Sequence, residues 1–162
     1  MRILYLLFLT FAVTACSTRG DSSRETLEIN GFNYTDLYID DFSVNGQGGG
    51  NVFVSSETSG GGGSVCCIYW DKSATPPVTV TVEWTYDRTQ TCKQEVQLEE
   101  PYPANPQHLG IHFFQDGHVE AALSEEYPEL KLQLSRFDYE IRKETGNEMP
   151  PCANPSEDLQ IE

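Results

Sequence analysis

Basic residues are scarce in this sequence. Its 162 residues include 10 Lys and Arg but 25 Asp and Glu, which gives a formal net charge of −15 at pH 7. Proteins bind nucleic acid largely through Lys and Arg contacts to phosphates, so this composition argues against a nucleic-acid partner. An acidic surface would instead attract a basic protein and raise its rate of association. The alternative is that the charge serves only solubility.

The sequence also lacks an apolar run long enough to span a membrane. Its main apolar stretch, residues 3–13, is much shorter than the roughly 20 residues that a membrane-spanning helix needs. Arg2 precedes this stretch and small residues follow it. That arrangement predicts a cleaved signal peptide over residues 1–15.

Residues 13–16 read Val-Thr-Ala-Cys and resemble the lipobox of bacterial lipoproteins. We therefore expect Cys16 to carry a lipid anchor, although an ordinary signal peptide with a chance cysteine is the alternative. Each buried methylene contributes about 0.8 kcal/mol, so several acyl chains would hold the protein firmly to a membrane. Ser17 in place of Asp favours the outer membrane, facing the periplasm. Residues 16–26 then form the lipidated cysteine and a polar, flexible tether.

Four cysteines follow the anchor, and none has the two-residue spacing of a zinc ribbon. An even number of cysteines in an exported chain predicts disulfides, here among Cys66, Cys67, Cys92 and Cys152. Pairing Cys66 with Cys67 is the least favoured connectivity, because adjacent residues would close a strained ring. The other two connectivities remain open.

The remaining sequence predicts a single mainly-β domain over residues 27–162, with antiparallel, sandwich-like sheets stapled by disulfides. Apolar residues alternate strictly over residues 78–86. Asn45-Gly46 favours a tight turn between strands at 37–44 and 51–54. A second hairpin is expected from residues 109–114 and 119–123, and a further strand at 65–70. One short C-terminal helix is predicted, from the capping pattern at Ser135 to Gly146.

Two glycine-rich segments, residues 46–50 and 60–63, flank predicted strands. Neither is followed by the Lys-Ser or Lys-Thr of a phosphate-binding loop, and neither opens a predicted helix. We interpret them as flexible loops that permit close backbone approach, with adaptation to a partner surface as the functional alternative.

No catalytic residue, metal site or cofactor is expected. The sequence Gly62-Gly63-Ser64-Val65-Cys66 lacks the closing glycine of a nucleophile elbow. Three histidines near Asp116 could imitate a metal or acid–base cluster, namely His108, His112 and His118. Against this, the neighbours of His112 are apolar, as expected for a buried strand position.

Several motifs of this sequence together resemble a known family. They are the lipobox ending at Cys16, residues 33–36, 43–50 and 60–64, the pair Cys66-Cys67, and residues 112–119. The family is the bacterial lipoprotein family filed as domain of unknown function 3304. Members of this family look like neighbours of type VI secretion effectors, particularly phospholipases. The resemblance implies an immunity protein and supplies no catalytic motif.

We therefore expect a membrane-tethered periplasmic immunity protein that neutralises a phospholipase effector by stoichiometric binding. It would cover the active-site mouth or the membrane-docking surface of the effector. The candidate contacts, besides the glycine segments, are the acidic residues Asp36, Asp40, Asp41, Glu99, Glu100, Glu125 and Glu126.

Two other functions stay open at this point. The first is a structural or envelope-associated lipoprotein without an inhibitory role. The second is a small hydrolase that depends on His112 or His118.

Overall fold

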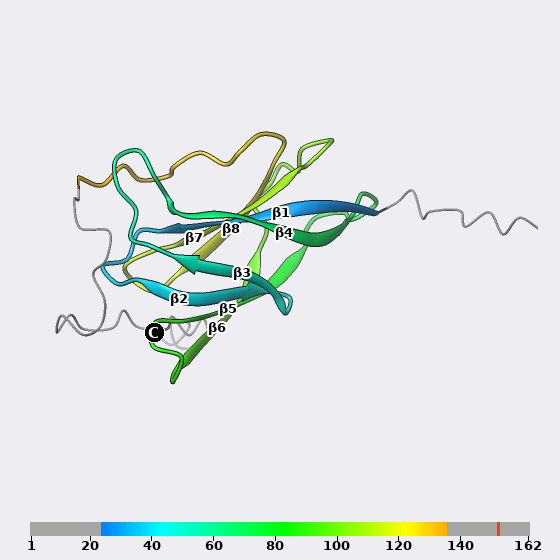
Figure 1. Ribbon diagram of the computed structural model, residues 1–162. Coiled ribbons are helices and arrows are strands. Elements are labelled where there is room, and N and C mark those ends of the chain that lie inside the picture. The colour runs from blue at the N-terminus through cyan, green and yellow to red at the C-terminus, as the bar shows by residue number, and fades with distance from the viewer. Residues whose placement is uncertain (1–23, 136–151, 153–162) are drawn as a thin grey trace, which may run out of the picture.

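The computed structural model describes residues 24–135 and Cys152, and these residues form two packed β-sheets (Figure 1). The strands are β1 (Arg24–Asn33), β2 (Ile39–Val44), β3 (Gln47–Val52), β4 (Gly61–Asp71), β5 (Thr79–Thr85), β6 (Thr91–Gln97), β7 (His108–Phe113) and β8 (Val119–Ser124). The first sheet has the order β4-β1-β7-β8 and the second has the order β3-β2-β5-β6. The prediction of a mainly-β fold with sandwich-like sheets is confirmed.

One strand pair departs from the expected antiparallel arrangement. β1 runs parallel to β7, whereas every other neighbouring pair in the two sheets is antiparallel. A parallel pair needs a long connection, and residues 34–107 provide one by building β2 to β6 in between. β1 is therefore an interior strand of the first sheet, although it lies at the start of the described chain.

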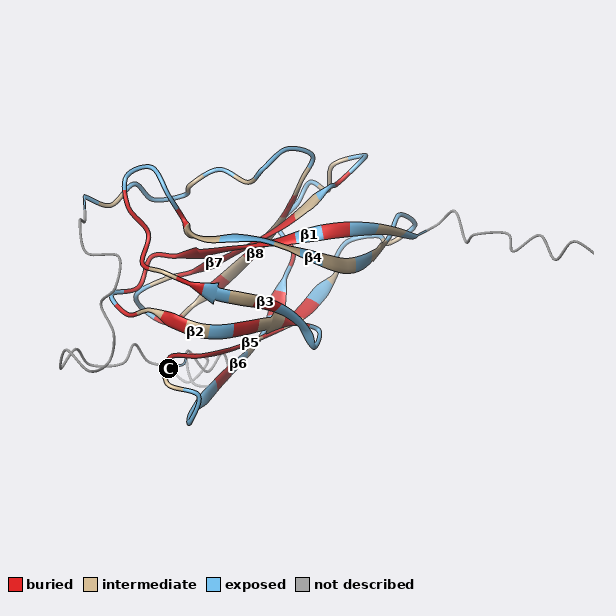
Figure 2. Cartoon of the chain, in the orientation of Figure 1, coloured by how far each residue is buried: buried red, intermediate tan, exposed pale blue. Residues whose placement is uncertain are grey.

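The core lies between the two sheets. Val80, Val82 and Trp84 of β5 are buried, which confirms the alternation predicted there. The ring of Phe113 on β7 packs against Trp84 and against Phe42 on β2, with ring centroids 5.5 and 5.4 Å apart. Figure 2 shows buried positions recurring along β2 and β5, and a continuous buried run in β7. These aromatic contacts join the two sheets.

A second buried layer covers the outer face of the first sheet. Phe32, Tyr34 and His112 are buried but lie outside the core cluster. Residues 125–135, here called the strap, cross this face (Figure 1). The backbone N–H of Lys131 in the strap donates to the hydroxyl of Tyr34 at 2.8 Å, and the ring of Tyr127 lies 6.1 Å from that of Phe32. β7 and the second half of β1 are thus buried on both faces of the first sheet.

The expected tight turn at Asn45-Gly46 is confirmed, since both residues have positive φ, 50° and 78°. The interpretation of the glycine-rich segments as flexible loops is wrong, because residues 47–50 belong to β3 and residues 61–63 to β4. Close backbone approach explains the glycines instead. A Cβ atom on Gly49 would overlap the ring of Phe42.

Of two boundaries predicted from the sequence, the end of the tether needs correction, and the C-terminal helix lies almost entirely outside the described residues. Residues 24–26 were assigned to the tether but are the first residues of β1, where Arg24 pairs with Asp71 of β4. The ordered domain therefore begins before residue 27. The predicted helix from Ser135 to Gly146 lies beyond the described residues except for its first position. Within residues 24–135, no helix has the length and apolar character to cross a membrane.

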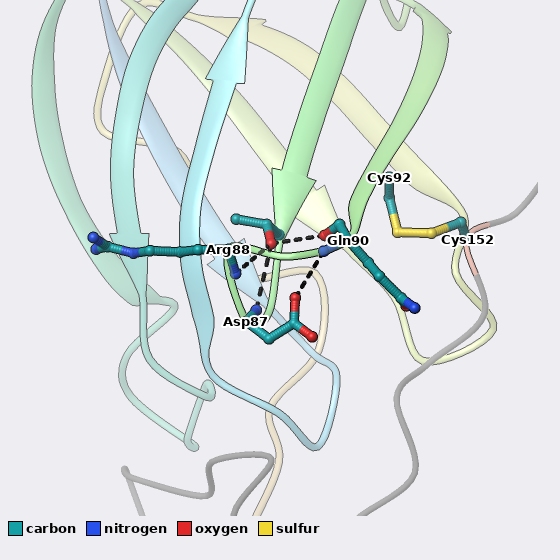
Figure 3. Close-up of a disulfide and its surroundings, with 6 residues drawn as sticks. Asp87, Arg88, Gln90, Cys92 and Cys152 are labelled. Carbon is teal, nitrogen blue, oxygen red and sulfur yellow. Dashed lines mark hydrogen bonds between the residues drawn. A yellow bond between two sulfur atoms is a disulfide. The ribbon is translucent and has the colours of Figure 1, made fainter.

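The structure pairs Cys92 with Cys152 and Cys66 with Cys67, so the expectation against the adjacent pair is wrong. Leu27 of β1 pairs with Ile68 but Glu28 pairs with Cys66, which leaves Cys67 as an extra residue in β4. Such a bulge interrupts the alternation of side chains across a strand. The two sulfur atoms therefore need not lie on opposite faces. The Cys92–Cys152 bridge joins β6 to the C-terminal region, with Cα atoms 5.3 Å apart (Figure 3).

This pairing predicts a specific peptide map. Trypsin cleaves after Lys and Arg, so Cys66 and Cys67 fall in one peptide, residues 25–72, while Cys92 falls in residues 89–93 and Cys152 in residues 144–162. Without reduction, mass spectrometry should show the first peptide unlinked and the other two joined. A link between residues 25–72 and either of the other peptides would contradict the pairing.

The close approach at Gly49 predicts a position-specific stability effect. Gly49→Ala should lower the free energy of unfolding by about 1–3 kcal/mol, because the added methyl group must displace Phe42 in the core. Gly48→Ala is the matched control, since a Cβ there meets nothing within 4 Å, and it should change stability by only about 0.5 kcal/mol. Urea unfolding monitored by Trp fluorescence measures both. Equal effects at the two positions would contradict this packing.

Candidate partner-binding surface

The end of the sandwich farthest from the start of β1, here called the distal end, carries the β3–β4 loop, residues 53–60, and three further loops. These three are residues 34–38 between β1 and β2, 86–90 between β5 and β6, and 114–118 between β7 and β8 (Figure 1). The backbone N–H of Tyr34 donates to the carbonyl of Phe113 at the end of β7, at 2.8 Å, and the side chain of Gln115 in the third loop donates to Asp36 in the first. Arg88 in the second loop forms an ion pair with Asp40 on β2 at 3.4 Å.

Acidic side chains gather at this end. Asp36 and Asp116 lie in two of the loops, Asp87 lies in the third, and Asp40 and Asp41 lie at the start of β2. Of these, Asp36, Asp41 and Asp116 are exposed. Arg88 has a largely exposed side chain and forms an ion pair with Asp40. Five carboxylates thus lie together at the distal end.

The loop at residues 86–90 is held by its own side chains (Figure 3). A carboxylate oxygen of Asp87 accepts hydrogen bonds from the backbone N–H groups of Thr89 and Gln90, both at 2.9 Å. The hydroxyl of Thr85 accepts the N–H of Arg88 at 2.8 Å and donates to the carbonyl of Gln90 at 2.7 Å. These hydrogen bonds stabilise the positive φ of Arg88, 58°, and give the loop a defined shape.

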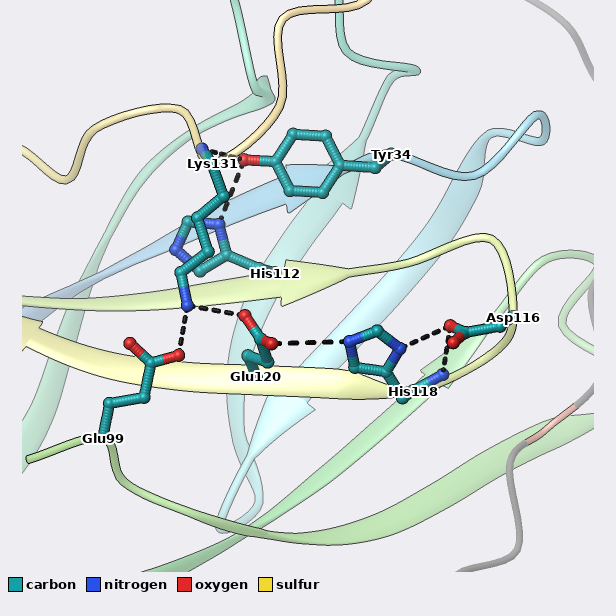
Figure 4. Close-up of polar contacts among 7 residues, drawn as sticks. All are labelled: Tyr34, Glu99, His112, Asp116, His118, Glu120 and Lys131. Carbon is teal, nitrogen blue, oxygen red and sulfur yellow. Dashed lines mark hydrogen bonds and ion pairs between the residues drawn. The ribbon is translucent and has the colours of Figure 1, made fainter.

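A polar network connects the distal end to the strap (Figure 4). His118 contacts Asp116 on one side and Glu120 on the other, the latter with a nitrogen–oxygen distance of 3.5 Å. Glu120 also accepts a hydrogen bond from the ammonium group of Lys131 at 2.6 Å, and Lys131 contacts Glu99 as well. Lys131 therefore joins the strap to β8 and to the segment that follows β6.

The charges of this network stabilise one another. Burial alone would lower the pKa of Lys131, but its hydrogen bonds to Glu120 and Glu99 outweigh that effect and the pKa is raised. Burial would likewise raise the pKa of Glu120, but the hydrogen bond and charge of Lys131 and the contact with His118 lower it overall. Both groups are thus held in their charged forms.

His112 is neutral and enclosed. Burial, with a smaller contribution from the charge of Lys131, lowers its pKa to about 3. The ring stacks on Phe32 at a centroid distance of 4.5 Å. Because the hydroxyl of Tyr34 accepts the N–H of Lys131, its proton is available for Nδ1 of His112 at 3.2 Å. A histidine in this state packs as a polar aromatic group.

The three histidines do not form one site. His108 donates to the side-chain oxygen of Asn30 at 3.1 Å, whereas His118 contacts Asp116 at the distal end. Among the described residues, no three His, Cys, Asp or Glu side chains are placed to hold a metal ion.

The seven acidic residues proposed as contacts do not lie on one surface. Asp36, Asp40 and Asp41 are together at the distal end. Glu99 and Glu100 follow β6, and Glu125 and Glu126 follow β8, where Glu125 accepts a hydrogen bond from the N–H of Asn105 at 3.1 Å. Asp87 and Glu120 were missed among the candidate contacts. Asp87 begins a short polar segment, which favours a turn. Nothing in the sequence places Glu120 beside Lys131.

Residues 32–121 match the family described as "Protein of unknown function (DUF3304)". The chain belongs to this family. No curated protein and no solved structure matches the chain. The matched DUF3304 region runs from β1 to β8 and includes all four distal loops. It also includes Cys66, Cys67 and Cys92, whereas Cys16, Cys152 and the strap lie outside it.

The buried His112 predicts a pH dependence of stability. Its folded pKa of about 3 lies below the ordinary value of 6.5, so between these values the unfolded chain binds one more proton than the folded chain. Stability should therefore fall as the pH falls through this window, by up to about 1.4 kcal/mol per pH unit from this group. In His112→Phe, that part of the slope should disappear.

The measurement is urea unfolding at several pH values across this window, for the wild type and each variant. His118→Phe is the control, because its side chain is 42% exposed and lies at a turn. If His112→Phe kept the wild-type slope, the neutral state of His112 would be refuted.

Proposed function

We propose that this protein is a membrane-tethered periplasmic immunity protein. In this proposal it binds a type VI secretion phospholipase effector and neutralises it by stoichiometric inhibition. One observation carries the proposal: the five carboxylates of the distal end lie at the far end of β1 from the segment that leads to Cys16. The resemblance to lipoproteins beside such effectors supplies the class of partner.

The geometry of β1 favours this orientation. The strand has 10 residues, and at about 3.3 Å per residue it separates the two ends of the sandwich by roughly 33 Å. A lipid on Cys16 would hold one end near the membrane, so the distal end would face away from the bilayer. An incoming effector would then meet the acidic loops first.

The charge at the distal end favours rapid capture. Complementary charges raise association rates, most strongly at low ionic strength. Internal hydrogen bonds and ion pairs hold the loops that carry Asp36, Asp87 and Asp116, so binding would order few additional groups. The neutral, enclosed state of His112 favours binding over acid–base chemistry, which needs a pKa near the working pH.

The test is a binding assay with the product of the adjacent gene, read by mass and by lipase activity. The mature chain from Ser17, with its disulfides formed, should form a one-to-one complex and abolish lipase activity. Asp36→Lys combined with Asp41→Lys should slow association by about ten-fold or more at low salt, because it reverses two exposed charges at the distal end.

The matched control is Glu125→Lys combined with Glu126→Lys. It makes the same change in net charge in the segment that follows β8, which is an edge strand of the first sheet. This control should retain inhibition and lose much less of the association rate. No complex at low salt would refute the immunity function and leave an envelope-associated lipoprotein, whereas equal losses in both variants would refute the distal surface.

A further inference from the structure

An apolar cavity of about 190 Å³ opens at the tether end of the sandwich, opposite the distal end. Its lining comes from the first residues of β1, β5 and β7 and the last residues of β4 and β8. The apolar side chains that line it include Leu27, Ile68, Trp70, Val78, Leu109 and Leu123. The two sheets therefore leave an open pocket between them at this end.

The size and lining of the cavity suit part of a hydrocarbon chain. An apolar cavity of roughly 150 Å³ stays free of water and binds molecules of the size of benzene. Polar groups lie only at the edge of this pocket, where Asn45, Asp71 and Thr79 contribute to the lining. A ligand with an apolar end and a polar head would match both parts.

Charged residues of both signs lie beside the mouth of the cavity, although only Asp71 is part of its lining. Lys72 forms an ion pair with Glu25, and Arg24 lies opposite Asp71 in the β1–β4 ladder. The side chain of Asp71 also accepts hydrogen bonds from Ser73 at 2.7 and 2.9 Å. Further carboxylates also lie at this end, after β6 and β8, those of Glu99, Glu100, Glu125 and Glu126. Surroundings that contain both signs of charge but more carboxylates than cations fit a zwitterionic head group better than an anionic one.

The position of the mouth indicates where such a ligand would come from. Residues 17–23 separate Cys16 from the start of β1, and a chain spans at most about 3.6 Å per residue. A lipid on Cys16 would therefore keep the mouth within roughly 30 Å of the membrane surface. Membrane lipids are then the nearest source of hydrocarbon chains.

We propose that this cavity binds one acyl chain of a zwitterionic membrane lipid, whose head group rests on the rim formed by Arg24, Glu25, Asp71 and Lys72. The inference shares the lipid tether with the proposed function but does not depend on an effector. Chain binding would orient the tether end toward the bilayer, beyond what the tether alone imposes.

The experiment uses dodecylphosphocholine, a single-chain zwitterionic lipid analogue, below its micelle concentration. The protein is the chain from residue 16 with Cys16→Ser, so that no lipid of its own competes. Isothermal titration calorimetry should show saturable binding of one molecule per chain. Dodecanoate, which has an anionic head, should bind at least about ten-fold more weakly.

A variant that fills the mouth tests the location. Ala74 is half-buried in the cavity wall, in the segment between β4 and β5, so Ala74→Trp should weaken binding by about ten-fold or more without altering a core strand. Ala104→Trp is the matched control, because Ala104 is exposed and does not line the cavity. No saturable binding, equal binding of both amphiphiles, or unchanged binding in Ala74→Trp would each overturn the proposal.

A second measurement tests the location without a substitution that fills the cavity. The chain has two Trp residues, Trp70 in the cavity wall and Trp84 in the core. A dodecyl chain brominated near its methyl end should quench fluorescence in the Cys16→Ser protein, and Trp70→Phe should remove most of that quenching. Equal quenching in both proteins would place the chain elsewhere. Because no effector is present, the result is independent of the immunity assay.

Discussion

The pairing of β1 with both β4 and β7 is the constraint on which the rest of this structure depends. β1 lies inside the first sheet, antiparallel to β4 and parallel to β7. Its inward side chains, such as Leu27 and Ile29, enter the core, and its outward Phe32 supports the second buried layer. Because the strand runs the length of the sandwich, it also fixes the direction in which the chain leaves toward Cys16. The identities of the two ends, one near the tether and one distal, follow from this single strand.

The strap explains how Tyr34 and His112 are buried on the outer face of the first sheet. Lys131 is the main cation of the polar network there, and it offsets the charges of Glu99 and Glu120 while its backbone anchors Tyr34. Buried polar groups destabilise a fold unless they are paired, and the buried hydroxyl of Tyr34 is paired with both Lys131 and His112. The strap also lies over His112, whose low pKa is a direct result of that coverage. Packing and electrostatics at this face are therefore inseparable.

The sequence predicted β5 from its alternation and β7 from its hairpin with β8, but it did not predict β1 or β6 and it misinterpreted the glycines of β3 and β4. The alternation that identified β5 exists because its outer side chains meet water. β1 gave no such pattern, since residues 29–33 are buried on both sides. The glycines of β3 suggested a loop, because their close approach to Phe42 arises only in the folded structure and leaves no local signal in the sequence. Likewise, the bulge at Cys67 that accompanies the adjacent disulfide depends on the register with β1, which no local signal records.

The candidate surface was only partly predictable for a similar reason. Asp36, Asp40 and Asp41 are close in sequence and remain close in space, whereas Glu99 and Glu125 lie elsewhere because the strands that precede them end away from the distal loops. Net charge is a property of composition, but a binding surface requires that charges converge. At the distal end they converge because hydrogen bonds and ion pairs hold the loops together, whereas at the tether end the ion pairs Lys72–Glu25 and Lys131–Glu99 lie among further carboxylates around an apolar mouth. In the two proposals, the same acidic chain thus offers the carboxylates of its loops to a protein partner at one end and an apolar opening to a lipid at the other.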